Sequence, residues 1–277
     1  MTLGETLRKA AEYLGDKGVE SPRLDAELLF AQALEMTRIG LYTEHDRPLM
    51  EGELASLRQL VARRGRREPL AYILGEWGFR RLTLRVDRRA LIPRPETEIL
   101  VERCLEHLRG LQEPRVLDVG TGSGAIALAI AHEHAGARVT GIDSSAGAIA
   151  LAGENRELTG LGDRVELVER DLADGLPSGP WELVASNPPY VAPAEIETLQ
   201  PEIRDWEPHA ALAGEGVHEG VAGAASRVLA SGGWLVLEVG DGQAEEVAAG
   251  LEALGYVAVS ITPDLTERHR VVEGRWP

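Results

Sequence analysis

The chain has 277 residues, of which 44% are hydrophobic, and its formal net charge is −16. This length and composition support a large core with a second, smaller module, and they exclude a disordered chain. No apolar run approaches the roughly 18 residues of a membrane span, and the single cysteine, Cys104, excludes an intramolecular disulfide and a Cys-rich metal site. The N-terminus lacks the order of a signal peptide, so we expect a cytoplasmic location and no membrane partner.

The negative charge is unevenly distributed along the chain. Residues 1–70 carry a net charge of −1, residues 71–110 of +2 and residues 111–277 of −17. A region this acidic repels phosphate backbones, so we expect no direct nucleic-acid partner. The stretch 63–94 is the exception, because it holds ten arginines and only three acids. It indicates either a solvated connector or a docking edge for an acidic or RNA-bound partner.

The first 75 residues predict a small helical bundle. Apolar residues recur at helical spacing from Leu3 to Leu14, and Ser21 followed by Pro22 is typical of a helix start. This part contains no reactive motif, so we expect it to position a partner. Residues 76–92 then alternate aromatic or β-branched residues with polar ones, which predicts a short hairpin linker.

From residue 93 onward, buried strands alternate with helices. This order favours an α/β fold with a doubly wound, mostly parallel, seven-stranded sheet. No helix separates the last two strands, which predicts an antiparallel hairpin at one edge. The expected strands lie at 115–120, 137–143, 164–171, 181–190, 232–240, 256–263 and 268–276.

Three glycines follow the first of these strands. Gly120, Gly122 and Gly124 stand directly before a helix, where glycine permits a sharp turn and close approach to a ligand. The next strand ends at Asp143, whose carboxylate can accept both hydroxyls of a ribose. The spacing G-x-G-x-G differs from the G-x-G-x-x-G of dinucleotide folds and favours S-adenosylmethionine. A tight turn without a ligand is the alternative.

The third strand leads into Asp171 and Leu172. An adenine ring would reach this position if a nucleoside lay across the strand ends. The carboxylate of Asp171 can accept the adenine amino group, and the Leu172 side chain can pack on the ring. The alternative is a solvated loop aspartate.

The fourth strand ends in Asn187, Pro188, Pro189 and Tyr190. An amide nitrogen is a poor nucleophile because its lone pair is delocalised, so methyl transfer benefits from acceptors that hold both of its hydrogens. The Asn187 side-chain oxygen and the Pro188 peptide carbonyl can supply them, and the prolines keep them fixed. The Tyr190 ring can cover the planar group. A rigid turn that merely ends the strand is the alternative.

These motifs, taken together, resemble a known family. The glycine loop, Asp143 and the Asn-Pro-Pro-Tyr sequence, in this order, look like the class I S-adenosylmethionine-dependent methyltransferases that modify planar nitrogens. LIPRPETEILVE at 91–102, EPHAALAGEGVHEG at 207–220, GGWLVLEVGDGQ at 232–243 and DLTERHRVV at 264–272 are similar to the N5-glutamine methyltransferases of peptide chain release factors. The resemblance covers nearly the whole chain.

The resemblance implies a class I methyltransferase fold with S-adenosylmethionine as cofactor and S-adenosylhomocysteine as product. It implies class I peptide chain release factors as partners, with methylation at N5 of the glutamine in their Gly-Gly-Gln motif. The implied catalytic residues are Asn187, Pro188 and Tyr190, and Pro189 joins them in substrate binding. The implied cofactor-binding residues are Gly120, Thr121, Gly122, Ser123, Gly124, Asp143, Asp171, Leu172 and Asn187. The family often has an aromatic residue at the position of Leu172.

We therefore expect three parts: a helical substrate-recognition domain at 1–75, a hairpin linker at 76–92 and a catalytic domain at 93–277. We expect a monomer, and no metal, because the seven histidines show no shared ligand spacing. Arg94 is expected to pair with an acid and brace the loop beside the site, and Glu238 to help shape the pocket.

Three other functions remain open at this point. The substrate glutamine could belong to a ribosomal protein. The same Asn-Pro-Pro-Tyr sequence could serve N-methylation of adenine or guanine in nucleic acid, which the charge of residues 111–277 disfavours. The glycine loop could also belong to a nicotinamide-dependent oxidoreductase or a dinucleotide-binding module.

Overall fold

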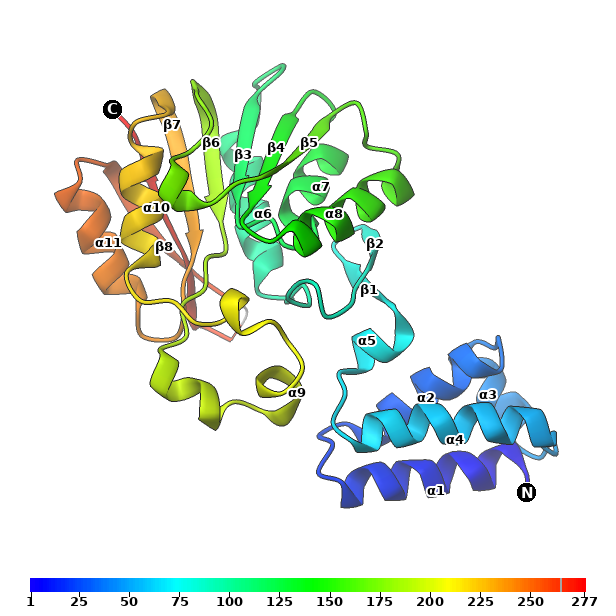
Figure 1. Cartoon of the computed structure of the whole chain (residues 1–277). Coiled ribbons are helices and arrows are strands. Elements are labelled where there is room, and N and C mark those ends of the chain that lie inside the picture. The colour runs from blue at the N-terminus through cyan, green and yellow to red at the C-terminus, as the bar shows by residue number, and fades with distance from the viewer. Residues whose placement is uncertain (265) are drawn as a thin grey trace. The chain divides into compact units, whose positions relative to one another are not determined.

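The computed structural model describes residues 1–264 and 266–277, and Leu265 of the DLTERHRVV segment lies outside them. The chain forms two compact units (Figure 1). The N-terminal unit consists of Met1–Gly75 together with Gln200–Trp206. The larger unit consists of Glu76–Leu199 and Glu207–Pro277.

The N-terminal unit is helical. Its helices are α1 Leu3–Asp16, α2 Pro22–Ala33, α3 Arg38–Thr43, α4 Glu51–Gly65, α5 Leu70–Leu74 and α9 Pro201–Arg204. Thr2 and Glu5 form a capping box that satisfies free N–H groups at the start of α1. Leu7, Leu14 and Phe30 are buried in its core, and the helical spacing from Leu3 to Leu14 predicts the first two. Helices α1 and α4 approach closely at Gly65. A Cβ added to this glycine would lie only 2.6 Å from the Tyr13 ring.

Charged side chains hold the segment 200–206 within the N-terminal unit. The guanidinium of buried Arg64 lies 2.7 Å from Asp25 and 2.8 Å from Glu202. Arg67 pairs with the same Glu202 carboxylate at 2.6 Å. The Gln200 amide donates to the Glu20 carboxylate at 2.6 Å. The carboxylate of Glu202 thus offsets two cations, one of which is almost fully removed from water.

The larger unit is built on a seven-stranded sheet of order β5-β4-β3-β6-β7-β9-β8. Its strands are β3 Arg115–Val119, β4 Arg138–Asp143, β5 Val165–Glu169, β6 Trp181–Ser186, β7 Leu229–Glu238, β8 Val257–Pro263 and β9 His269–Arg275. Strands β3 to β7 pair in parallel, and β9 pairs antiparallel with both β7 and β8. The predicted doubly wound sheet with an antiparallel hairpin at one edge is confirmed.

Helices cover both faces of this sheet (Figure 1). They are α6 Thr97–His107, α7 Ala125–Glu133, α8 Ala146–Thr159, α10 Val217–Ala225 and α11 Ala244–Ala253, with the short 3₁₀ helices η1 Leu172–Asp174, η2 Pro193–Thr198 and η3 His209–Ala211. Neighbouring residues of β3 serve opposite cores: Val116 packs with α6 and α7, and Leu117 packs with α10 and α11. Buried parallel strands of this kind bring their carboxyl ends together at one edge.

The predicted hairpin is present as β1 Glu76–Phe79 and β2 Leu82–Arg85. Phe79 and Leu84 are buried in the core formed by α6 and α7, so the hairpin packs on the larger unit. At its tip, Arg80 forms an ion pair with Glu133 of α7. No helix among the described residues is long and apolar enough to cross a bilayer.

Candidate active site

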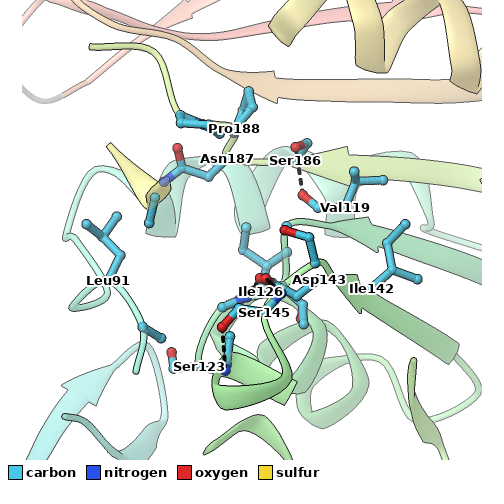
Figure 2. A pocket seen from close by; sticks show the side chains of 18 of the residues that line it. Leu91, Val119, Ser123, Ile126, Ile142, Asp143, Ser145, Ser186, Asn187 and Pro188 are labelled. Carbon is cyan, nitrogen blue, oxygen red and sulfur yellow. Dashed lines mark hydrogen bonds between the residues drawn. The ribbon is translucent and has the colours of Figure 1, made fainter. Parts of the chain in front are cut away.

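A cavity of about 450 Å³ opens at the carboxyl ends of β3, β4 and β6 (Figure 2). The edge where parallel strands end is where open α/β sheets bind ligands. The segment 89–94 and the start of α6 contribute to its wall, as do η3 and the first turns of α10. The predicted site residues in its lining are Gly120, Thr121, Gly122, Ser123, Asp143, Asp171, Leu172, Asn187, Pro188 and Pro189.

The glycine loop wraps the end of β4. The backbone N–H groups of Gly120 and Thr121 both donate to the Ile142 carbonyl at 2.9 Å, and the N–H of Gly122 donates to Asp143 at 2.9 Å. Gly120 and Gly122 have φ values of 75° and 56°, which side chains disfavour. The loop backbone therefore faces the cavity without a Cβ at these two positions.

Gly124 has a different structural role from the other two glycines. It is absent from the cavity lining and stands at the start of α7 with φ of 84°. A Cβ there would come within 3.1 Å of Leu128 and 3.2 Å of Ala152. This glycine permits α7 and α8 to pack closely behind the loop.

Asp143 is oriented by two backbone donors. Its Oδ2 accepts the N–H of Gly122 and its Oδ1 accepts the N–H of Ser145, each at 2.9 Å. The side chain is partly exposed and lines the cavity. Each carboxylate oxygen has more than one acceptor site, so both remain able to accept a ligand hydroxyl.

Asp118 supports the loop from beneath. It is fully buried, and its Oδ2 accepts the Thr121 hydroxyl at 2.6 Å and the Ala127 N–H at 3.2 Å. The other oxygen, Oδ1, has no hydrogen-bond partner among the described residues. Burial raises the pKa of Asp118 to about 7, because a charged carboxylate is poorly solvated there.

Asp171 and Leu172 border the cavity after β5. The Asp171 Oδ1 accepts the Ala173 N–H at 2.8 Å and thereby caps η1. Leu172 is partly buried and packs against the hydrophobic core that includes Val217 and Val221. Leu172 therefore gives this side of the cavity an apolar surface.

Asn187 follows the end of β6 and faces the cavity (Figure 2). Its Nδ2 donates to the Thr97 hydroxyl oxygen at 3.2 Å, so its Oδ1 is the atom left to accept. The preceding Ser186 is fixed by a hydrogen bond from its hydroxyl to the Val119 carbonyl at 2.7 Å. Strands β3 and β6 are thus tied together at the mouth of the cavity.

Tyr190 lies near this edge but is not in the cavity lining. Its ring stacks on His218 with 6.5 Å between centroids, and its backbone carbonyl accepts the Gln243 amide at 3.0 Å. Burial raises the pKa of its hydroxyl to about 12, so the phenol is neutral at physiological pH. These contacts position the end of the Asn-Pro-Pro-Tyr turn.

The segment before α6 is braced as expected. Arg94 lies 2.5 Å from the Glu207 carboxylate, which is almost fully buried and also accepts the Ile92 N–H at 3.2 Å. The expectation that Arg94 pairs with an acid is confirmed. No sequence pattern points to Glu207 as its partner, because this acid lies 113 residues further along the chain and forms no spacing with Arg94.

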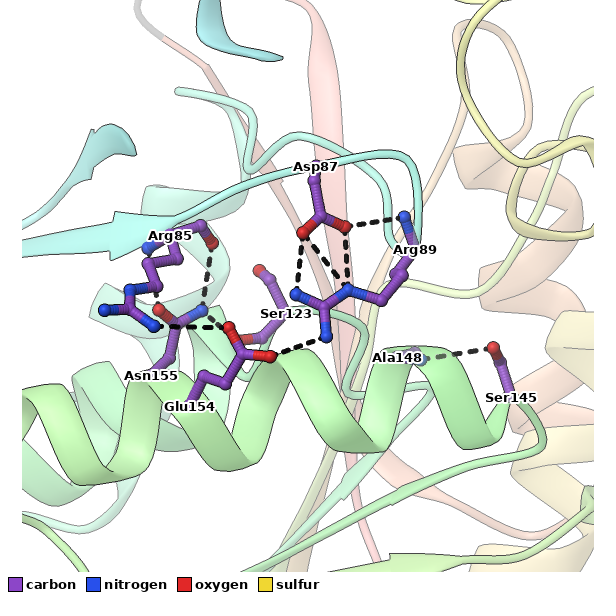
Figure 3. Close-up of polar contacts among 8 residues, drawn as sticks. All are labelled: Arg85, Asp87, Arg89, Ser123, Ser145, Ala148, Glu154 and Asn155. Carbon is purple, nitrogen blue, oxygen red and sulfur yellow. Dashed lines mark hydrogen bonds and ion pairs between the residues drawn. The ribbon is translucent and has the colours of Figure 1, made fainter. Parts of the chain in front are cut away.

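A second set of polar contacts ties the end of the hairpin to the glycine loop (Figure 3). Asn155 of α8 is fully buried, accepts the Arg85 N–H at 2.7 Å, and donates to the carbonyls of Arg85 and Ser123 at 3.0 and 2.9 Å. Nearby, Arg89 pairs with Asp87 at 2.7 Å and Glu154 at 2.6 Å. Sequence reasoning missed Asn155, because one asparagine in a helix forms no pattern.

Most of the arginines of residues 63–94 have partners within their own unit. Eight of the ten form ion pairs: Arg63, Arg64, Arg67, Arg80, Arg81, Arg85, Arg89 and Arg94. Their carboxylate partners neutralise much of the positive charge that these arginines carry. These ion pairs favour a structural role for residues 63–94 over a docking edge for a partner.

Among residues 1–264 and 266–277, no group of three or more His, Cys, Asp or Glu side chains is placed to hold a metal ion. The cavity lining instead combines the glycine-loop residues, the carboxyl-bearing Asp143 and Asp171, and apolar residues such as Leu91 and Ile126. Such a lining suits an organic molecule with hydroxyls and an aromatic ring.

Known proteins match this chain over most of its length. Residues 5–75 match a family model described as "PrmC N-terminal domain", and residues 95–203 match one described as "Methyltransferase small domain". A release factor glutamine methyltransferase of Geobacter sulfurreducens is 44% identical, with 98% of this chain and 96% of that protein covered. One of Deinococcus radiodurans is 41% identical, with 99% of each covered. The solved hMettl16 catalytic domain in complex with MAT2A 3'UTR hairpin 6 is alike in fold, with a TM-score of 0.54 and 16% identity over 70% of this chain and 75% of that one.

Proposed function

This chain belongs to the release factor glutamine methyltransferase family, and we propose that it methylates the glutamine of the Gly-Gly-Gln motif in class I peptide chain release factors. The acceptor atom is the side-chain amide nitrogen N5. A carbon–nitrogen bond forms as the carbon–sulfur bond breaks, and the products are N5-methylglutamine, S-adenosylhomocysteine and one proton, which the methylated nitrogen loses to water. The observation that carries this proposal is the match with relatives of that name along nearly the whole chain. The position of Asn187 beside the glycine-loop cavity supports it.

S-adenosylmethionine is the cofactor, and the cavity residues fit it. The carboxylate of Asp143 is held by two backbone N–H groups and keeps acceptor sites for a ribose. Gly120 and Gly122 leave their backbone uncovered, and Leu172 offers an apolar surface beside Asp171 for adenine. The residues proposed to bind the cofactor all line the cavity: Gly120, Thr121, Gly122, Ser123, Asp143, Asp171, Leu172 and Asn187. Gly124 packs behind the loop and is not among them.

The bound cofactor supplies a methyl group on a positively charged sulfur, which leaves as a neutral thioether. The protein's part is to present the substrate nitrogen with its lone pair free. The Asn187 Oδ1 and the Pro188 carbonyl accept the two amide hydrogens, which favours a pyramidal nitrogen. Pro188 and Pro189 restrict the backbone, so the acceptors are placed before the substrate arrives. The ring of Tyr190 stacks on His218 outside the cavity lining, so we propose that Tyr190 holds the end of this turn in place.

We assign the proposed roles to three parts of the chain. Residues 1–75 recognise the release factor. Residues 76–92 form the hairpin that links this part to the rest of the chain. Residues 93–277 bind the cofactor and catalyse methyl transfer. We propose a cytoplasmic location, because the proposed substrate works in translation. We also propose that the chain acts as a monomer. The net charge of −17 on residues 111–277 supports a protein substrate without direct nucleic-acid binding.

A methyl-transfer assay tests the proposal. The purified chain is mixed with S-adenosylmethionine and a release factor of the same organism, and the mass change is mapped by peptide. One added methyl on the Gly-Gly-Gln glutamine is expected, and Asn187→Ala should lose it. Gln112→Ala removes an exposed amide elsewhere and serves as the control. A methyl that appears only on a ribosomal protein or a nucleic acid would refute the proposed substrate.

A further inference from the structure

Thr97, the first residue of α6, lies between Asn187 and a buried acid. Its side chain is only 4% exposed, and its Oγ1 accepts the Nδ2–H of Asn187 at 3.2 Å. Glu238, the last residue of β7, lies next to the Thr97 side chain, is 1% exposed, and leaves its Oε2 without a hydrogen-bond partner among the described residues. Three side chains from α6, β7 and the end of β6 therefore form one chain of contacts beside the cavity.

The direction of these hydrogen bonds follows from the number of hydrogens available. A threonine hydroxyl has a single hydrogen, and the Glu238 carboxyl accepts it when ionised, although burial raises the pKa of Glu238 to about 7. When that hydrogen goes to Glu238, Thr97 presents only lone pairs to Asn187. The Asn187 amide must then turn its NH2 toward Thr97, because the opposite orientation would set two acceptors against each other without a proton.

This orientation determines what Asn187 offers to a ligand. With its NH2 engaged by Thr97, the Oδ1 is the atom left to accept an N–H from the cavity. The proposed reaction needs an acceptor at this place, since a substrate amide carries two hydrogens to be held. An amide turned the other way would present a donor to a donor.

We propose that Thr97 is a positioning residue that fixes the side-chain orientation of Asn187 by accepting a hydrogen bond from its Nδ2. This inference rests on the proposed function, because it takes Asn187 to hold the substrate amide. The inference gives a role to Thr97, which lies in the segment 92–98 (IPRPETE). Neither the sequence of this segment nor the position of Thr97 at a helix start predicts that role. Its effect belongs to the chemical step and not to cofactor binding.

Two variants separate the hydroxyl from the shape of the side chain. Thr97→Val keeps the branched shape and removes the hydroxyl, whereas Thr97→Ser keeps the hydroxyl. A misplaced group near the reacting atoms costs up to about 100-fold in rate, so Thr97→Val should lower kcat roughly 10- to 100-fold. The affinity for S-adenosylhomocysteine should stay close to that of the unchanged protein, and Thr97→Ser should recover most of kcat.

A second readout needs no activity. The chain contains only two asparagines, Asn155 and Asn187, so selective 15N labelling of asparagine gives two side-chain NH2 signals. Asn155 is buried against two carbonyls and serves as an internal reference. In Thr97→Val the Asn187 NH2 should exchange with water at least about tenfold faster, because its hydrogen bond is gone. Thr97→Ser should exchange like the unchanged protein.

The results separate this inference from the proposed function. Unchanged Asn187 exchange in Thr97→Val overturns the inference whatever the substrate proves to be. So does a Thr97→Val enzyme with full kcat and weakened cofactor binding, because the threonine would then serve the cofactor. If release factors are not methylated at all, the proposed function fails, and the exchange measurement still tests the orientation of Asn187.

Discussion

Individual polar side chains carry much of the organisation at the strand ends. Asp118, Asp143, Asn155 and Glu207 each bind backbone groups from another segment, and three of the four are almost completely buried. A buried polar group with a partner is tolerated, whereas one that loses its partner costs about 1–3 kcal/mol. Changes at these positions should therefore be visible in binding or in stability.

At Asp143, we expect Asp143→Ala to weaken binding of S-adenosylhomocysteine by about 10-fold or more, since two backbone N–H groups and the ligand lose their common acceptor. Isothermal calorimetry measures the change. Asp163→Ala removes an exposed carboxylate and is the matched control. Equal affinities for both variants would mean that Asp143 does not contact the ligand.

Asp118 should make the stability depend on pH. Its pKa is raised from 3.8 to about 7 by burial, so the folded protein binds this proton more tightly than the unfolded chain does. The protonated Asp118 therefore contributes its full share to the free energy of unfolding below pH 3.8, the pKa of the carboxyl in the unfolded chain. This contribution is lost as the pH rises toward 7. At ~1.4 kcal/mol per pKa unit, the loss amounts to at most about 4 kcal/mol.

Urea unfolding between pH 5 and 8 measures this effect. Asp118→Asn retains an oxygen for the Thr121 hydroxyl and cannot ionise. The variant should therefore show a flatter dependence of the free energy of unfolding on pH over the lower part of that range. An identical slope in both proteins would show that Asp118 does not carry the proton.

At the scale of elements, the hairpin and α8 are joined to the glycine loop through Asn155 (Figure 3). Asn155→Ala leaves one buried N–H and two carbonyls without their partner. We expect a loss of about 2–4 kcal/mol in the free energy of unfolding and weaker cofactor binding, both measurable by thermal shift with and without S-adenosylhomocysteine. Glu154→Gln changes the neighbouring exposed ion pair of Arg85 and Arg89 and should leave both nearly unchanged.

The elements themselves were largely predictable from the sequence. Strand residues such as Val116 and Leu117 belong to short apolar runs, and Gly120 and Gly122 mark the turn by their backbone conformation. Local patterns of this kind can be recognised because they depend only on residues that are close together in the sequence. Asn155, Glu207 and the contact of Thr97 with Asn187 were not predicted, because each joins segments far apart in the chain and leaves no local pattern.

At the scale of the whole molecule, the chain passes between the two units more than once. The segment Gln200–Trp206 belongs to the N-terminal unit, although its neighbours on both sides belong to the larger one. The sequence predicted one continuous domain from residue 93, since nothing in these seven residues marks their association with Arg64 and Arg67. Ion pairs between distant segments cannot be predicted from the spacing of apolar residues along the chain.

Glu202→Ala tests this association. Arg64 would keep Asp25 but lose its second carboxylate while remaining buried, and Arg67 would lose its partner. We expect faster hydrogen exchange at 200–206 and in α2 and α4, with a cost of about 2 kcal/mol to the N-terminal unit. Glu197→Ala, on the exposed part of η2, is the control. Unchanged exchange would show that the ion pairs do not hold the segment.

Recombination between relatives meets a constraint from this arrangement. A chimera made by a single crossover at Gly75 would join the helices of one parent to residues 200–206 of the other. Arg64 and Arg67 would then face a segment that was not selected alongside them. Two further crossovers, on either side of Gln200–Trp206, would transfer the N-terminal unit intact, so the smallest exchangeable module of this protein is discontinuous in its gene.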